Sequence, residues 1–207
     1  MTPTTPRRTV PVFLAVWLAI SAGCAGTVPS KFYTLTPMKA PDAPGKGVSA
    51  GEGSFLAVGP VTLPDYLDRP QIMTRSEGNE VRLHETERWA GSLEGDISRV
   101  LRENLSALLA GNRITVVRWS PATHPQASFR NRVGVEILRF EGALGGTVVL
   151  KARYTLYGAD GRKVVSVGES TVREAAGSPE YESLVAAMSR ALATLSRNIA
   201  AAYRETI

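Results

Sequence analysis

The sequence predicts a two-layer α+β domain, in which a mostly antiparallel sheet carries two helices packed on one face. Two long stretches place apolar residues three and four positions apart, which is typical of helices with one buried face. Several shorter segments are rich in β-branched residues, and some alternate apolar with polar residues, as strands do. The order is three strands, a helix, four strands and a helix, which favours a sheet with helices on one side.

The first three predicted strands cover residues 55–63, 71–75 and 80–84. The first is apolar and ends at Pro64. The second and third are short, and the sequence SEGN at residues 76–79 is typical of a turn between them.

The first predicted helix is marked by one apolar stripe, formed by Trp89, Leu93, Ile97, Val100, Leu101, Leu105 and Leu108. Gly111 with Asn112 is a good stop signal. Glu85 and Glu87 come before this stripe, so we expect them to favour the N-terminus of the helix rather than to act as acid and base.

Four further strands are predicted over residues 113–119, 132–141, 147–157 and 163–172. The last two flank GADG at residues 158–161, a hairpin signal. In the first arm of this hairpin apolar and polar residues alternate, which indicates one buried and one solvated face.

The final predicted helix has Ser178 as its N-cap and Pro179 in its first position. Its apolar stripe consists of Tyr181, Leu184, Val185, Met188, Leu192, Leu195 and Ile199.

Length and composition fit one ordinary globular domain. The chain has 207 residues, 43% of them hydrophobic and 21% charged. The formal net charge is +5, and removal of Arg7 and Arg8 with an export signal leaves +3. Such a mild surplus is no nucleic-acid footprint, so we expect no nucleic-acid partner.

The first 24 residues have the layout of an export signal, with two arginines, an apolar stretch over residues 10–20 and three small residues. A bilayer-spanning helix needs roughly 20 apolar residues, so this shorter run is not expected to be a permanent anchor. Ala22-Gly23-Cys24 resembles the lipobox of bacterial lipoproteins, although Ser21 stands where leucine is common. We expect cleavage before Cys24 and lipid attachment to its sulfur. The alternative is an ordinary secretory signal with an unrelated cysteine.

The domain organisation follows from this processing. Residues 1–23 are the expected signal peptide, and residues 24–53 are a lipidated N-terminus and flexible tether rich in Pro, Gly, Ala and Ser. Within the tether, residues 31–35 (KFYTL) are expected to add a short strand or to dock on the domain. Residues 54–207 form the expected single periplasmic domain.

No catalytic constellation stands out, so we expect no enzyme, no cofactor and no metal site. His84-Glu85 begins like the zinc motif H-E-x-x-H, but Arg88 occupies the second histidine position. Cys24 is the only cysteine, and GALGG at residues 142–146 lacks the lysine and hydroxyl residue that complete a P-loop.

Two segments are candidates for partner binding. The first comprises Pro64, Tyr66, Leu67, Asp68, Arg69 and Pro70, which combine rigid turns, an aromatic residue and opposite charges. The second is Arg88 with Trp89. A purely structural role is the alternative for both, with Tyr66 and Trp89 packing and the charges satisfied locally.

These same segments carry a family resemblance. LPDYLDRPQIMTR, NEVRL, ERWAGSL and RVLRENLSALL, which follow one another within residues 63–109, resemble the PqiC-type lipoproteins, also called auxiliary lipoprotein components of ABC-type transport. KFYTL at residues 31–35 is similar to the tyrosine-containing mature N-terminal segment of that family. The resemblance runs from about Phe32 to the last helix.

The resemblance implies a non-enzymatic, outer-membrane-anchored partner of MCE-domain proteins, which form channels or tunnels across the periplasm of Gram-negative bacteria for lipid trafficking and envelope integrity. By resemblance to enterobacterial sorting rules, Ala25 after the cysteine also implies the periplasmic face of the outer membrane. A ring-forming partner would favour several copies of the chain, so a homo-oligomer is a further expectation. The alternative function is a periplasmic carrier or chaperone that holds phospholipid between sheet and helices.

Overall fold

The computed structural model describes residues 28–39, 54–75, 78–112, 114–120, 131–158 and 161–206. These residues form eight strands in one sheet, two α-helices and a short 3-10 helix. In chain order the elements are β1 (Lys31–Tyr33), β2 (Ser54–Thr62), β3 (Gln71–Arg75), β4 (Val81–Trp89), α2 (Leu93–Leu109), η1 (Ala110–Asn112), β5 (Ile114–Arg118), β6 (Asn131–Gly142), β7 (Thr147–Tyr157), β8 (Val164–Ala175) and α3 (Tyr181–Arg204).

The sheet branches at β6. One edge of β6 pairs with β7 along nearly its whole length, while the other edge pairs with β2 in its first half and with β3 at Gly142. One branch therefore continues to β5 and the other through β3 and β4 to β1. The long β6–β7 and β7–β8 ladders are antiparallel, whereas β1–β4, β2–β5 and β2–β6 are parallel. The predicted α+β class is confirmed, with a sheet that is mixed.

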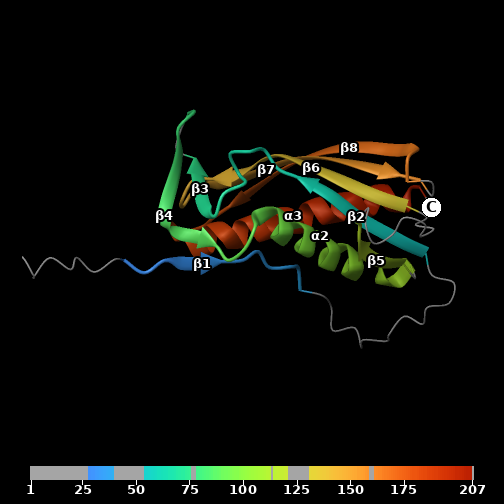
Figure 1. Ribbon diagram of the computed structural model, residues 1–207, viewed down its shortest axis with the longest axis horizontal. Helices are drawn as coiled ribbons and strands as arrows, with labels where there is room; N and C mark the ends of the chain where they lie inside the picture. The colour runs from blue at the N-terminus through green and yellow to red at the C-terminus, as the bar shows by residue number, and fades with distance from the viewer. Residues whose placement is uncertain are drawn as a thin grey trace, which may run out of the picture.

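Both helices cover the same face of the sheet, as predicted. Helix α3 packs on β6, β7 and β8, and α2 packs on β2 and β5 (Figure 1). The buried side chains of β7, which are Val148, Leu150, Ala152, Tyr154 and Leu156, join those of both helices in one hydrophobic core. The space between the two layers is therefore occupied by side chains of the protein itself.

Helix α2 begins later than its apolar stripe indicates. Ser92 is the N-cap, and its Oγ accepts a hydrogen bond from the backbone N–H of Gly95. Trp89 is the last residue of β4 rather than the first turn of the helix, because its N–H donates to the Pro70 carbonyl. Glu85 and Glu87 consequently lie in a strand, and the prediction that they favour the helix N-terminus is wrong. Glu94 and Asp96 are the acids in the first turn.

Helix α3 also starts later than predicted, after the N-cap Glu180. The carbonyl of Ser178 accepts a hydrogen bond from Gly145 in the turn between β6 and β7, so this residue ties two loops together instead of capping the helix. The predicted N-cap at Ser178 is therefore wrong.

The domain is longer in one direction than in the others (Figure 1). Strands β1, β3 and β4 lie at one end of the long axis, which we call the β1 end, and β5 and the last turns of α3 lie toward the other, the far end. Within the described part of the chain, neither helix combines the length and the apolar character needed to cross a bilayer.

Candidate partner-binding surface

The loop between β2 and β3 contains the first predicted binding segment, and it folds into a tight turn. The Leu67 N–H donates to the Pro64 carbonyl (2.9 Å), and the Asp68 N–H donates to the Asp65 carbonyl (3.3 Å). The Leu67 side chain is buried in the core. The turn therefore places the Leu67 side chain beneath the loop, where it packs in the hydrophobic core.

A buried carboxylate fixes the same loop from below. Glu141, at the end of β6, is only 1% exposed. Its carboxylate accepts a hydrogen bond from the Tyr66 hydroxyl (2.8 Å) and forms ion pairs with Arg75 Nε (2.7 Å) and Arg139 Nε (2.9 Å). Burial of a lone carboxylate is costly, so the two guanidinium groups and the phenol are what allow Glu141 to lie there.

The pKa values of two groups around Glu141 reflect this arrangement. Burial and the hydrogen bond to Glu141 raise the pKa of Tyr66 to about 12. The hydrogen bond to Glu141 also raises the pKa of Arg75. Both groups stay protonated near neutral pH, and the cluster is a structural clamp rather than an acid–base pair.

The second predicted binding segment lies beside the first. Arg88 is opposite Gln71 in the β3–β4 ladder, and the Trp89 N–H donates to the Pro70 carbonyl (2.8 Å). Trp89 is buried in the core, and Arg88 is half-buried. The structure thus brings the two predicted segments together, although they are separated in sequence.

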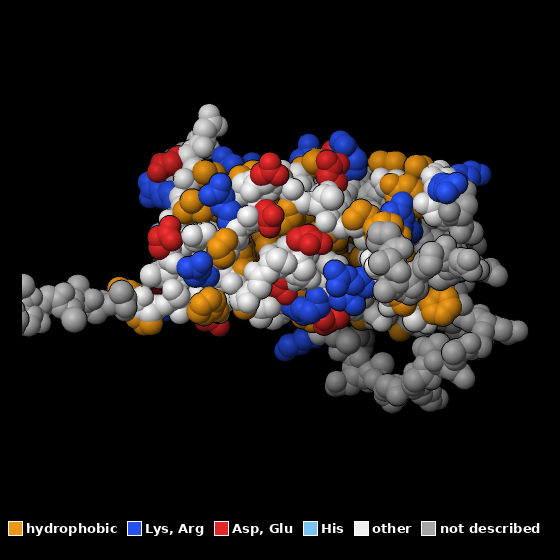
Figure 2. All heavy atoms as spheres, in the orientation of Figure 1, with side chains coloured by type: hydrophobic (Ala, Val, Ile, Leu, Met, Phe, Trp, Pro, Cys, Tyr) orange, Lys and Arg blue, Asp and Glu red, His pale blue; other side chains and the backbone are white. Residues whose placement is uncertain are grey.

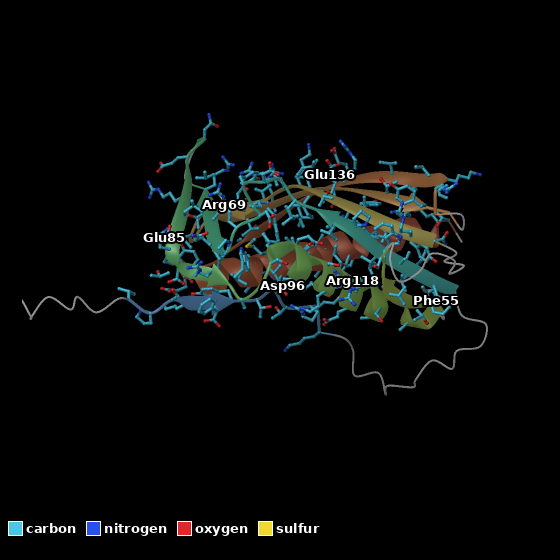
Figure 3. All side chains as sticks on the ribbon, in the orientation of Figure 1. Phe55, Arg69, Glu85, Asp96, Arg118 and Glu136 are labelled. Carbon is cyan, nitrogen blue, oxygen red and sulfur yellow. The ribbon has the colours of Figure 1, made fainter. Side chains whose placement is uncertain are left out.

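Only part of the predicted set is accessible to a partner. Asp68, Arg69 and Pro70 are exposed, whereas Leu67 and Trp89 are buried and Pro64, Tyr66 and Arg88 are partly covered. In Figure 3, Arg69 and Glu85 lie toward the β1 end, on the loop that precedes β3 and on β4. We call Asp68, Arg69 and Pro70 the exposed loop tip.

Hydrogen bonds attach a segment near the N-terminus, residues 34–38, to both helices. Asp96 of α2 accepts hydrogen bonds from the Leu35 N–H and the Thr34 hydroxyl, and Arg99 donates to the Leu35 carbonyl (2.6 Å) while pairing with Asp96. The Leu35 side chain is fully buried. Within residues 31–35, Lys31–Tyr33 pair with β4 and the Leu35 side chain packs in the core.

The segment continues along α2 and α3 beyond residue 35. The Thr36 N–H donates to Ser189 Oγ (3.1 Å), and the Met38 N–H donates to Asn104 Oδ1 (2.8 Å). Asn104 is fully buried and donates in turn to Ser196 Oγ (3.1 Å). Ser189 and Asn104 thus interrupt otherwise apolar helix faces, and each accepts a hydrogen bond from the backbone of a distant segment.

Aromatic side chains surround the point where β1 meets α3. The Tyr33 hydroxyl donates to Glu87 (2.6 Å), and Tyr181 lies against both Tyr33 and His84, with ring centroids 6.2 and 5.2 Å away. Burial and the bond to Glu87 raise the pKa of Tyr33 to about 12. His84 thus packs against an aromatic ring, and the described residues contain no group of side chains suited to a metal ion.

The far end carries a feature that sequence reasoning missed. The Arg132 guanidinium lies 4.0 Å from the Tyr157 ring centroid and 4.9 Å from that of Trp119, on the sheet face away from the helices. It lines an open pocket of about 250 Å³ with Pro60, Glu136 and Arg153. No spacing in the sequence signals this stack, because its members come from three separate strands or their ends.

The residues that hold the loop and the N-terminal segment were missed as well. They are Arg75, Arg139 and Glu141 for the loop and Asp96, Arg99 and Asn104 for the segment. The available signal was a charged or amide residue within an otherwise buried stripe, as at Asn104 and Glu141. Cys24, the predicted lipid-attachment residue, lies outside the described residues.

Comparison with known families gives a match over nearly the whole folded region. Residues 33–200 match the model of a family described as ABC-type transport auxiliary lipoprotein component. Two curated relatives, from Escherichia coli (strain K12) and Shigella flexneri, are each named intermembrane transport lipoprotein PqiC. Each is 27% identical over 144 residues, which are 69% of this chain and 70% of the relative.

Solved structures share the fold. A crystal structure of an uncharacterized protein superimposes with a TM-score of 0.69 and 20% identity, covering 87% of this chain and 100% of that one. Protein XCC0632 from Xanthomonas campestris gives a TM-score of 0.62 and 18% identity, with 83% and 93% covered. At these identities the two structures support the architecture alone.

Proposed function

Because this chain belongs to the family of ABC-type transport auxiliary lipoprotein components, we propose that it is a non-enzymatic subunit of an MCE-type lipid transport system. It is held by a lipid on Cys24 at the periplasmic face of the outer membrane of a Gram-negative bacterium. There it positions an MCE-domain protein that reaches the outer membrane from the periplasm, and several copies serve one such partner.

The observation that carries this proposal is the position of the family match. It begins at Tyr33 in β1 and ends in α3, so it includes the docked N-terminal segment together with the folded domain. A lipobox-like Ala22-Gly23-Cys24 lies just before the matched region. An envelope lipoprotein with a folded periplasmic domain is the organisation that these two facts support.

An adaptor role suits the chemistry of the described residues. Their buried polar groups hold loops and segments in place, as Glu141 does for Tyr66 and Asn104 does for Met38. The alternative role as a phospholipid carrier receives less support, because side chains of both layers fill the space between the sheet and the helices.

The surface proposed for the partner is the exposed loop tip, Asp68, Arg69 and Pro70. It is anchored from below by Leu67 and Tyr66, so its backbone presents a preorganised shape. Rigid presentation lowers the entropy cost of association, which favours a binding role for such a tip. The opposite charges of Asp68 and Arg69 give it the means to select a partner by charge.

The experiment is a capture of the lipidated chain from native membranes with co-purifying proteins identified by mass spectrometry. We expect an MCE-domain protein with the wild type and a clear depletion of it with Cys24→Ala. Arg69→Glu should weaken the capture at least fivefold, whereas Arg173→Glu, an exposed arginine on β8, should leave it unchanged.

Three results would argue against the proposal. Wild-type protein recovered in the soluble fraction would remove the anchor at Cys24. Absence of any MCE-domain protein from a membrane-bound wild type would remove the partner. Equal effects of the two arginine substitutions would remove the loop tip as the contact.

A further inference from the structure

Building on the proposed anchor at Cys24, we infer that the β1 end of the domain rests on the lipid surface, with Val28 and Phe32 at the level of the headgroups. The molecule then stands with its long axis away from the membrane and its far end in the periplasm. The occupant of this apolar surface is a phospholipid bilayer.

The first argument is the short distance along the chain between the anchor and the domain. Val28 lies four positions after Cys24 in the sequence, and Phe32 lies eight positions after it. A fully extended chain covers at most ~3.6 Å per residue, which places Phe32 within about 29 Å of the anchoring sulfur.

The second argument is that the docked segment does not act as additional tether. Lys31–Tyr33 pairs with Glu87–Trp89, and the Ala90 N–H donates to the Tyr33 carbonyl (2.8 Å). Leu35 is fully buried beyond it. The domain is therefore held from β1, and the stretch after residue 39 contributes nothing to its reach.

The third argument is the chemistry of the surface that this places at the membrane. Val28 is 73% and Phe32 64% exposed, the two largest values among the exposed large hydrophobic side chains described. Lys31, also exposed, lies between them in sequence, and an ammonium group is attracted to anionic headgroups. Val81 and Leu83 add exposed apolar area on β4, the strand that pairs with β1.

Charge sets the depth of this contact. The exposed Glu85 lies on β4, and Glu182 lines the same groove as Phe32, so carboxylates flank the apolar residues. Carboxylates are repelled by anionic headgroups and are costly to bury in hydrocarbon. The contact is consequently shallow, limited to the headgroup region where an aromatic ring is favoured.

The far end supplies a matched control. Phe55 is 40% exposed and lies at the opposite end of the long axis from β1 (Figures 1 and 3). Figure 2 shows hydrophobic side chains both where the described chain begins and toward the far end, so exposed apolar area alone does not choose the end. The length of chain before β1 makes the choice.

The test uses the full chain, lipidated and reconstituted in vesicles of phosphatidylethanolamine and phosphatidylglycerol that contain a headgroup-nitroxide lipid. Phe32→Cys and Phe55→Cys variants carry a nitrobenzoxadiazole dye attached through maleimide. Wild-type protein treated in the same way takes up no dye if the Cys24 sulfur already carries the lipid. We expect nitroxide quenching at residue 32 to be at least twofold stronger than at residue 55.

The outcomes separate the two proposals. Protein that stays in solution, with Cys24 reactive toward maleimide, would overturn the anchor and this orientation together. Protein that sediments with the vesicles but is quenched equally at residues 32 and 55 would overturn the orientation alone. If Phe32→Cys fails to fold, Lys31→Cys reports on the same strand and decides the matter in the same way.

Discussion

Two segments without regular secondary structure cover the core near the β1 end, and different kinds of polar contact hold them in place. The N-terminal segment over residues 34–38 is held by side chains that bond to its backbone, from Asp96, Arg99, Ser189 and Asn104. The loop over residues 63–70 is held by side chains that meet at one buried carboxylate, Glu141.

The two kinds of contact fix different features of the chain. Bonds to backbone groups fix the path of a chain with little dependence on its side chains, as the bonds to the Thr36 and Met38 N–H groups do here. A shared carboxylate fixes particular side chains, Tyr66 and Arg75, and through them the shape of one loop. The first arrangement sets position, and the second presents a surface.

The largest loss of stability should come from removing one partner of the buried Glu141 carboxylate. Arg75→Met leaves the buried Glu141 with Arg139 and Tyr66 as its remaining partners, so we expect the free energy of unfolding to fall by about 3 kcal/mol. Urea denaturation measures this value.

Arg82→Met is the matched control for that prediction. Arg82 Nε lies 3.0 Å from Glu80 Oε1, but the two side chains are 60% and 59% exposed. Such an exposed surface pair contributes little to stability, so we expect this variant to unfold almost like the wild type. Similar losses in the two variants would show that burial of Glu141 is not what makes the clamp important.

A smaller effect should follow from loosening the N-terminal segment. Asn104→Ala removes the acceptor of the Met38 N–H and the donor to Ser196, and we expect a loss of about 2 kcal/mol. The amide of Met38 should also exchange with solvent faster, as hydrogen-exchange mass spectrometry would detect. Asn112→Ala, at an exposed site in η1, should change neither quantity. Unchanged exchange at Met38 would mean that Asn104 serves only the helix packing.

The smallest expected effect concerns how the stability contributed by the Tyr66–Glu141 contact depends on pH. The pKa of Tyr66 is about 12 in the folded protein and near 10 when solvated, so its contribution is complete below pH 10 and is lost as the pH rises toward 12. Tyr66→Phe should therefore flatten the decline of stability over this range. The difference at pH 11 should stay below about 1 kcal/mol, because the hydroxyl is only partly buried. Parallel curves for the two proteins, obtained by urea titration at each pH, would contradict the assignment.

Much of the architecture could be predicted from the sequence because it rests on local periodicity. The apolar stripes of α2 and α3 and the alternation in β7 report which face of each element is buried. The helix starts were less predictable. Trp89 fits the spacing of the α2 stripe, yet its N–H is used by the Pro70 carbonyl, and no local pattern contains that contact.

The polar contacts that hold the loop and the N-terminal segment could not be predicted for a related reason. Glu141 meets Tyr66 across 75 positions of sequence, and Ser189 meets Thr36 across 153. Local patterns indicate that a residue is polar in a buried stripe but not which distant group it satisfies. The exposed loop tip was found only together with the buried Leu67 and Trp89, because turn residues and packing residues alternate within the same short segment.

The docking of β1 also bears on the order in which the chain folds. The strand is the first described element to be synthesised, yet its pairing partner in β4 lies more than fifty residues later and the groove that accepts the following residues requires both helices. Contacts of such long sequence separation form slowly because a large loop must close first. We therefore expect residues 31–38 to be the last part of the described domain to order, after the sheet and both helices have formed.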